Sequence, residues 1–431
     1  MWGLYLLGAI LPVTTFLAFW LVWRGTIRRL GWVEDGQSLA PRALPPGVLI
    51  WAIGMMVMLV ALVAGHLDYD LGIAQTIKSM LGWVKGWALL FLFPLGGALL
   101  RIRPQIIFRA VCILGLQTLL LTPLLLATSQ MGMPEPLYVS PLHMIVGSEQ
   151  VFFAVNAAVK DYGSLGFRLQ YFAPWAPGAA LFASTAFVLA LFEKHPVWKA
   201  IGMIAAVSMC VFSLSRMSLI AIPTVTVAII ALSQLGRPFM MTFAAPVLAL
   251  GIAFAEPIAQ TAEDAEAAFT GARAESSRVR ATLQRIGLHR WRSEAPVFGH
   301  GVVERGPHLV EYMAIGSHHT WIGLLFVKGL VGMLACAIPL AWSIGEMTLK
   351  AQRDRLARCA LGLLLVMLLF SFGENLEALA YLYWPALVLL GIAARRRFRH
   401  PWQRNVRLAR NAIARREAQW PSNRHPGYAA Q

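Results

Sequence analysis

The stretch "SHHTWIGLLFVKGLVG", residues 317–332, places two adjacent histidines in front of a long apolar run that contains one lysine. A run of about 20 apolar residues is long enough to cross the hydrocarbon core of a bilayer as a helix. The stretch therefore predicts a membrane span over residues 318–342. The histidines mark its polar end, and Lys328 lies inside it.

The rest of the chain has the composition of a membrane protein. Of its 431 residues, 58% are hydrophobic and 13% are charged, whereas soluble globular proteins carry roughly 25% charged residues. Because the apolar residues come in long blocks, we expect an all-α polytopic integral membrane protein. The predicted spans number eleven: 2–23, 46–66, 81–100, 106–127, 176–192, 198–214, 218–233, 239–256, 318–342, 357–372 and 376–394.

Lysine and arginine concentrate in alternate short loops, such as the one that holds Arg101 and Arg103. Positive charge in short loops marks the cytoplasmic side of a membrane protein. This pattern predicts an outer N-terminus and a cytoplasmic C-terminus. The chain divides accordingly into N-terminal transmembrane helices (1–127), an outer loop (128–175), further transmembrane helices (176–256), a large outer loop with an amphipathic helix (257–317), C-terminal transmembrane helices (318–394) and a basic cytoplasmic tail (395–431).

The net charge of +16 would suggest a nucleic-acid partner in a soluble protein. Here the tail from Arg395 onward contributes much of it, so we expect anionic inner-leaflet lipid as its partner and no nucleic acid. The four cysteines lie in or at the edge of predicted spans, a placement that implies neither a disulfide framework nor a zinc site.

Several arginines occur in the outer segments. Arg216 lies in the link "SLSRMS", where it either snorkels to the surface or faces an anionic substrate. Arg278 and Arg280 belong to a basic stretch with arginines seven residues apart, which fits an amphipathic helix on the membrane surface. A solvated helix face would explain the same two residues. Arg168, among aromatic residues, would be structural if taken alone.

His318 and His319 begin the span of residues 318–342. Adjacent residues on a helix point about 100° apart, so the two imidazoles cannot share one small ligand. The pair therefore favours one functional imidazole with one neighbour over a metal site.

The spacing from His318 through nine residues to Gly329, and then to Gly332, resembles that of O-antigen ligases and, more loosely, of O-antigen polymerases in the same superfamily. "SLSRMSL" resembles the family's Ser-Arg turn. "ESSRVRATLQ" followed by "APVFGHG" resembles the arginine run and "PLLGVG" that precede the family's histidine. "RLQYFAPWAPG" resembles an upstream arginine segment that ends in Pro-Asn. The resemblance covers residues 165–335.

The chain departs from the family's pattern at several places. His319 stands where the family has Asn, Ser or Gln, and Trp175 replaces the Asn of the Pro-Asn segment. Val327 stands where the family often has an acidic residue. The family usually has twelve spans and a cytoplasmic N-terminus, so this chain either has a twelfth span or begins one span late.

The resemblance implies a GT-C-like glycosyltransferase architecture with about eleven or twelve transmembrane helices and two larger periplasmic loops. It also implies a bacterial inner-membrane enzyme whose active site faces the periplasm. This enzyme would transfer a glycan from an undecaprenyl-diphosphate carrier without a metal or other cofactor. The acceptor would be lipid A-core for a ligase. For a polymerase it would be a lipid-linked repeat unit of O-antigen, capsule or exopolysaccharide.

The site residues expected from this resemblance divide by role. The imidazole of His318 suits a general base, and arginine forks suit a diphosphate. The catalytic set is His318, Arg280 and Arg216, and the substrate-binding set is Arg278, Arg168, His319 and Lys328.

Two other classes of function remain open. Asp68 and Asp70 form a D-x-D pair near His66, which could hold Mg²⁺ or Mn²⁺ in a metal-dependent glycosyltransferase. Lys328, a charge inside a span, could mark the pathway of a transporter for the lipid-linked glycan. A solvated loop and a helix-packing contact are the structural interpretations of these two features.

Overall fold

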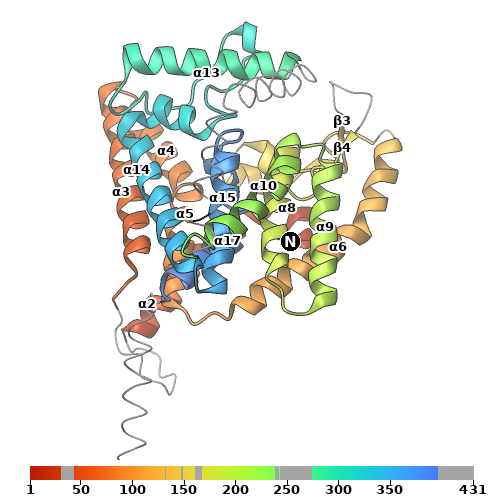
Figure 1. The fold of residues 1–431 in the computed structure, drawn as a ribbon. Coiled ribbons are helices and arrows are strands. Elements are labelled where there is room, and N and C mark those ends of the chain that lie inside the picture. The colour runs from red at the N-terminus through yellow and green to blue at the C-terminus, as the bar shows by residue number, and fades with distance from the viewer. Residues whose placement is uncertain are drawn as a thin grey trace, which may run out of the picture. The chain divides into compact units, whose positions relative to one another are not determined.

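The computed structural model describes residues 1–30, 43–131, 133–146, 149–160, 167–237, 242 and 274–396. The predicted span 239–256, the first part of the predicted loop 257–317 and the tail beyond residue 396 lie outside the described residues. Met1–Arg395 form one compact unit. Figure 1 shows that the described part of this unit is built almost entirely of helices.

The helices are α1 (Trp2–Leu6), α2 (Ile10–Arg29), α3 (Pro46–Asp68), α4 (Ile73–Lys85), α5 (Leu89–Leu99), α6 (Pro104–Gln130), α7 (Leu142–Val146), α8 (Ala176–Leu191), α9 (Pro196–Phe212), α10 (Arg216–Leu232), α13 (Ala274–Glu294), α14 (Thr320–Ala351), α15 (Arg355–Ser371), α16 (Leu376–Leu379) and α17 (Trp384–Ala394). Two 3₁₀ turns, η1 and η2, cover Gln150–Phe152 and His308–Val310. Two short antiparallel pairs join β1 (Tyr138–Val139) to β2 (Ala154–Val155) and β3 (Val159–Lys160) to β4 (Phe167–Arg168).

Among the described residues, four helices are long and apolar enough to cross a membrane, namely α2, α3, α6 and α14. The pair α4 and α5, bent by 43°, would make a fifth if it is one span. The shorter apolar helices α8, α9 and α10 coincide with predicted spans, whereas the predicted span 376–394 is divided into α16 and the apolar helix α17. A mostly helical, polytopic membrane protein is thus confirmed, whereas the number of eleven spans and the GT-C-like architecture stay predictions.

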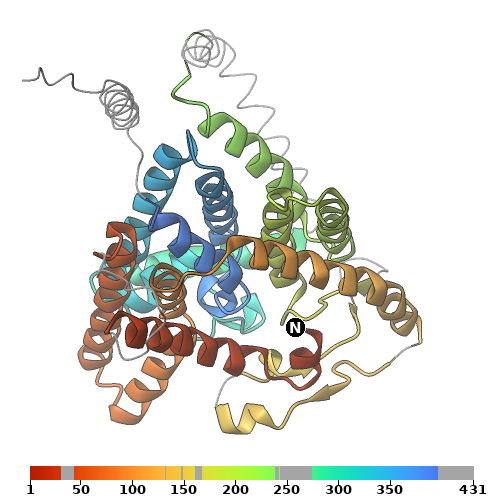
Figure 2. The ribbon, with the colours of Figure 1, turned by 90° about the horizontal axis from the view of Figure 1, so that it is seen from below.

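The first predicted span, 2–23, is interrupted. α1 ends at Leu6, and Gly8 adopts a positive φ of 63° before α2 begins. A side chain on Gly8 would collide with Ser140, so the loop after α6 packs against this turn. Tyr5 also accepts a hydrogen bond from the Asn156 amide at 2.8 Å. Figure 2 shows the red N-terminal helices beside this yellow segment.

Three loops predicted to lie on one side of the membrane meet at one end of the helices, which we call the loop end. Arg168, in the loop before α8, donates to the Ser213 carbonyl between α9 and α10 at 3.2 Å. Thr320, at the start of α14, donates to the Glu374 carbonyl beyond α15 at 2.6 Å. α13 lies across the same end, above α3 and α14 in Figure 1. Distant parts of the sequence therefore share one polar surface.

The longest described helix, α14, is broken at Gly329, whose backbone has φ 63° and ψ −166°. In a continuous helix the amides of Leu330 and Val331 would bond to the carbonyls of Phe326 and Val327. At the break, both amides and both carbonyls find partners outside α14 instead.

Residues 295–301, which we call the bridging segment, supply all four partners. The carbonyls of Pro296 and Val297 accept the two freed amides at 3.0 and 3.2 Å. The amides of His300 and Gly301 donate to the two freed carbonyls at 2.8 and 2.9 Å. Because unsatisfied backbone groups cost several kcal/mol where water is absent, this exchange is what allows α14 to open.

The bridging segment also packs against α3. A Cβ added to Gly65 would lie 3.0 Å from the carbonyl oxygens of both Phe298 and Gly299. The segment is therefore held between two helices, and it positions the end of α13 relative to both.

We predict that Gly329→Ala lowers the melting temperature of the purified protein. A Cβ there would collide with the Val297 carbonyl, and a positive φ costs a residue other than glycine about 1–3 kcal/mol. Gly345→Ala, in the same helix, is the matched control, because a Cβ there meets nothing within 4 Å and alanine favours a helix by about 1 kcal/mol. Equal melting temperatures for the two variants would contradict the structural role of the break.

Candidate functional site

Arg280 and His318 lie together at the loop end. Arg280 is on the half-buried side of α13, and His318 immediately precedes the N-cap of α14. Burial, with the positive charge of Arg280 adding to it, lowers the pKa of His318 from 6.5 to about 4. Its Nδ1 is buried without a hydrogen-bond partner among the described residues. His318 is therefore an uncharged imidazole at neutral pH, with a free nitrogen next to a fixed cation.

A buried carboxyl group, Glu374, lies behind this pair. The Glu374 residue is 4% exposed, and its Oε2 accepts a hydrogen bond from Trp175 Nε1 at 2.9 Å. Burial raises the pKa of Glu374 to about 7, although Arg280, the Trp175 hydrogen bond and Arg168 all act in the opposite direction. Near neutral pH this carboxyl group is thus divided between its charged and neutral forms.

Sequence reasoning missed Glu374. The signal that could have found it is the short link "FGEN" between the predicted spans 357–372 and 376–394, which holds an acidic residue on the side where the arginines gather. Trp175, noted in the sequence as a departure from Asn, takes the place of that amide as a donor and binds this carboxylate.

Arg168 acts electrostatically on Glu374, and the start of α10, which carries Arg216, lies beside the neighbouring Gly373. Arg168 bonds to the Ser213 carbonyl, and Arg216 begins α10 three residues later, half-buried. A Cβ on Gly373, next to Glu374, would lie 2.9 Å from the terminal methyl group of Met217. The structure thus brings Arg168, Arg216, Arg280 and His318 to one region around Glu374.

His319 has a structural task. It is the N-cap of α14, and its Nδ1 accepts the Ile322 amide at 3.3 Å. Its ring packs edge-on against Phe372, with the ring centroids 5.9 Å apart. Asn and Ser, which the family carries at this position, are also favoured N-caps. His319 thus caps the helix that His318 precedes, and its expected substrate contact stays a prediction.

Arg278 lies apart from Arg280 on α13, and its expected substrate contact stays a prediction. Residues two apart on a helix point about 200° apart, so Arg278 is exposed on the opposite face of α13 from Arg280. The inward face is anchored by Val279 and Leu283, which pack against Val310. Because these apolar residues contact protein, the predicted placement of α13 on the membrane surface through its apolar face is wrong for these positions.

Lys328 lies inside α14. Its ammonium is buried, lies 3.4 Å from Glu377 Oε2 and is 5.5 Å from the centre of the Trp87 ring. An acidic partner and an aromatic face are contacts that a helix-packing lysine makes. The expected contact between Lys328 and substrate stays a prediction.

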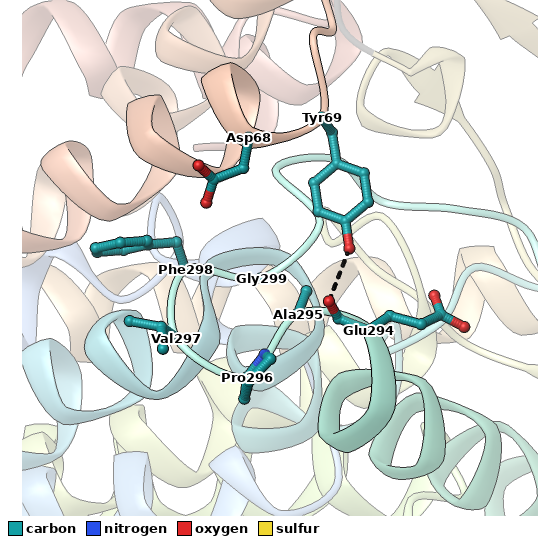
Figure 3. A pocket seen from close by; sticks show the side chains of 8 residues that line it. All are labelled: Asp68, Tyr69, Glu294, Ala295, Pro296, Val297, Phe298 and Gly299. Carbon is teal, nitrogen blue, oxygen red and sulfur yellow. Dashed lines mark hydrogen bonds between the residues drawn. The ribbon is translucent and has the colours of Figure 1, made fainter.

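Asp68, the first carboxylate of the D-x-D pair, borders a cavity of about 340 Å³ between the end of α3 and the bridging segment (Figure 3). Asp68 points into this cavity, and the Tyr69 hydroxyl donates to the Glu294 carbonyl at 3.3 Å. His66 turns into the helix packing, where its nitrogens contact the Leu62 carbonyl and the Ser79 hydroxyl. In the described ranges, no three His, Cys, Asp or Glu side chains come close enough together to hold a metal ion.

We predict that Glu374→Gln changes how thermal stability depends on pH. A buried carboxyl with a raised pKa stabilises the fold below its unfolded pKa of about 4.5, and this contribution is lost as the pH rises through about 7. The melting temperature of the variant relative to the wild type should therefore be higher at pH 8 than at pH 5. A difference that does not vary with pH would mean that Glu374 does not titrate in this range.

The comparisons with known proteins agree with this geometry. Residues 201–337 match the family model described as O-Antigen ligase, a range that runs from within α9 to the middle of α14. It contains Arg216, Arg280, His318 and Gly329. No curated protein matches the chain. The family indicates a glycosyl-transfer activity of the ligase or polymerase type in a multi-pass bacterial membrane protein. The resemblance seen in the sequence is thus supported over residues 201–337, which are similar to the O-antigen ligase family.

Proposed function

We propose that this protein transfers a glycan from an undecaprenyl-diphosphate carrier to an acceptor hydroxyl, as an O-antigen ligase does. The reaction would take place at the periplasmic face of the bacterial inner membrane during surface polysaccharide assembly. The observation that carries the proposal is the convergence of Arg280, Arg168 and Arg216 beside the uncharged His318. These residues come from four separate segments of the chain.

The arginines suit the leaving group. As the bond between the sugar carbon and the phosphate oxygen breaks, negative charge develops on the diphosphate. Guanidinium groups bind phosphate oxygens through a planar fork and stay charged at all relevant pH values. Their charges, fixed before the reaction, stabilise the developing charge without requiring a metal ion.

His318 suits the acceptor. The acceptor oxygen forms a new bond to the sugar carbon, and its proton must move to a base. A neutral imidazole can take that proton through the free nitrogen, and the low pKa of His318 keeps it uncharged at neutral pH. A base with so low a pKa is weak, but an anionic diphosphate bound to Arg280 would raise the pKa of His318.

Glu374 supports the arginines rather than replacing His318. Its carboxyl group is buried behind Trp175, and it partly offsets the charge of Arg280 and Arg168 when it is ionised. In this proposal Glu374 keeps three neighbouring cations in place before the diphosphate arrives.

The closest alternative is a polymerase that transfers the growing glycan to a lipid-linked repeat unit. The same site chemistry would serve, because only the molecule that carries the acceptor hydroxyl differs. The metal-dependent transferase is less favoured because both nitrogens of His66 already contact protein groups. The transporter loses its main support because Lys328 pairs with Glu377.

Reconstitution in nanodiscs with a lipid-linked oligosaccharide, with and without lipid A-core, tests the proposal. A lipid A conjugate is expected, and its formation should persist in EDTA. A longer lipid-linked glycan would instead show a polymerase. Loss of turnover on chelation, restored by Mg²⁺ or Mn²⁺, would favour the metal-dependent class. Unchanged glycan carried across the bilayer of a proteoliposome would mean a transporter.

We predict that His318→Ala lowers kcat by about 10²–10⁴-fold, the usual contribution of a general base. Binding of the lipid-linked donor should persist because the arginines remain. His319→Asn is the matched control, since asparagine keeps the N-cap, and it should turn over near the wild-type rate. Turnover and donor binding are measured on the same nanodisc samples. If His318→Ala keeps more than about a tenth of the wild-type rate, against that expected loss, another group is the base.

A further inference from the structure

The proposed chemistry needs Arg280 and His318 at a fixed separation, yet they belong to different elements. Arg280 is on α13 and His318 is at the start of α14. The apolar contacts of Val279 and Leu283 hold α13 down, but such contacts are not directional. Directional contacts such as hydrogen bonds between the two helices are needed to fix the position and the rotation of α13 relative to α14.

His300, in the bridging segment, provides contacts of this kind. Its ring is 1% exposed, with Nδ1 3.0 Å from the Phe326 carbonyl oxygen and Nε2 2.8 Å from Glu294 Oε2. The ring also stacks on Phe326, with centroids 4.3 Å apart and planes 21° apart. One side chain thus binds the last residue of α13 and the open turn of α14.

Both ring nitrogens of His300 have an oxygen partner on another element. One partner is the Phe326 backbone carbonyl in α14, and the other is the Glu294 carboxylate at the end of α13. Arg290, and secondly His300, lower the pKa of Glu294 to about 2, so this carboxylate only accepts hydrogen bonds.

Arg290 completes the arrangement. It binds Glu294 at 2.8 Å and Glu304 at 2.5 Å, and its guanidinium is 5.2 Å from the centre of the Phe326 ring. Phe326 therefore contacts the Arg290 guanidinium from α13 and the His300 ring from the bridging segment. Arg290 and His300 both contact the Glu294 carboxylate, so two side chains hold the end of α13.

We propose that His300 is a positioning residue, a hydrogen-bonded clamp that fixes α13 against the break in α14 and thereby sets Arg280 relative to His318. The proposal rests on the function proposed above. The family segment that "APVFGHG" resembles has valine where this chain has His300, so the clamp is a feature of this chain's own residues.

The test combines turnover with hydrogen exchange in nanodiscs. His300→Leu removes both ring nitrogens, and with them the contacts to Phe326 and Glu294, while it keeps a buried side chain of similar size. A misplacement of about 1 Å can cost 10²-fold in rate, so kcat should fall at least about tenfold. KM for the lipid-linked donor should stay near that of the wild type. Amide exchange of the peptides that contain residues 296–301 and 326–331 should become faster.

Three further variants separate a clamp from a general loss of structure. Glu294→Gln, at a partly exposed position, should show the same direction of change. A double variant combines His300→Leu with Glu294→Gln. The factor by which it lowers kcat should be smaller than the product of the factors for the two single variants, because the two residues act as one unit. His308→Leu, at an exposed histidine in the same loop, should match the wild type in all readouts.

If His300→Leu shows faster amide exchange but a wild-type kcat, the proposal is overturned, since the contacts of His300 would then not affect the reaction. Lost kcat with wild-type exchange would overturn it as well, since His300 would then act directly on the reacting groups. If the wild type transfers no glycan, the proposed function fails. In that case the exchange data alone still decide whether His300 ties the bridging segment to α14.

Discussion

A membrane helix that opens in its middle must satisfy its freed backbone groups where no water is available. In this protein the opening is at Gly329, and the four freed groups of α14 are all taken up by the bridging segment. Much of the loop end follows from this exchange. The bridging segment continues directly from α13, so it holds the helix that carries Arg280 above the start of α14. The resembling family's glycine spacing acquires a physical meaning, because Gly329 adopts the positive φ and leaves room for the Val297 carbonyl.

The electrostatics of the loop end reverse the ordinary order of titration. A free imidazole titrates about two pH units above a free carboxyl group, whereas here the pKa is about 4 for His318 and about 7 for Glu374. Burial is the main cause in both cases, because it disfavours the charged form of each group. The result is that His318 is a neutral base among arginine cations. The protonation of Glu374 depends on the charge of these arginines. An anionic ligand would change both groups at once, since it would offset the charge of Arg280, which acts on both.

The sequence predicted the helices well where hydrophobicity alone decides them. Long apolar runs became α3, α6 and α14 with boundaries close to those expected. The motif spacing selected Arg280 and His318, and the structure places Arg280 close enough to lower the pKa of His318, while their catalytic roles stay predictions. The break at Gly8 could not be predicted, because its cause is Ser140, far away in the sequence. Nor could the partner of Lys328, because Glu377 reaches it only through the packing of α16 against α14. Glu374 was missed because it is a single glutamate in a short link. Its pKa and its hydrogen bond depend on Trp175, Arg168 and Arg280, which belong to other segments of the chain.

The exchange of backbone hydrogen bonds at Gly329 also limits how this protein can be recombined with its relatives. The large loop before α14 looks like a module that could be exchanged to alter acceptor choice. Its last residues, however, complete the backbone of a transmembrane helix that lies after it in the chain. A chimera with a junction between the bridging segment and α14 would join two halves of one hydrogen-bonded unit from different parents. A junction at the lower end of α14, beyond the break, keeps that unit within a single parent.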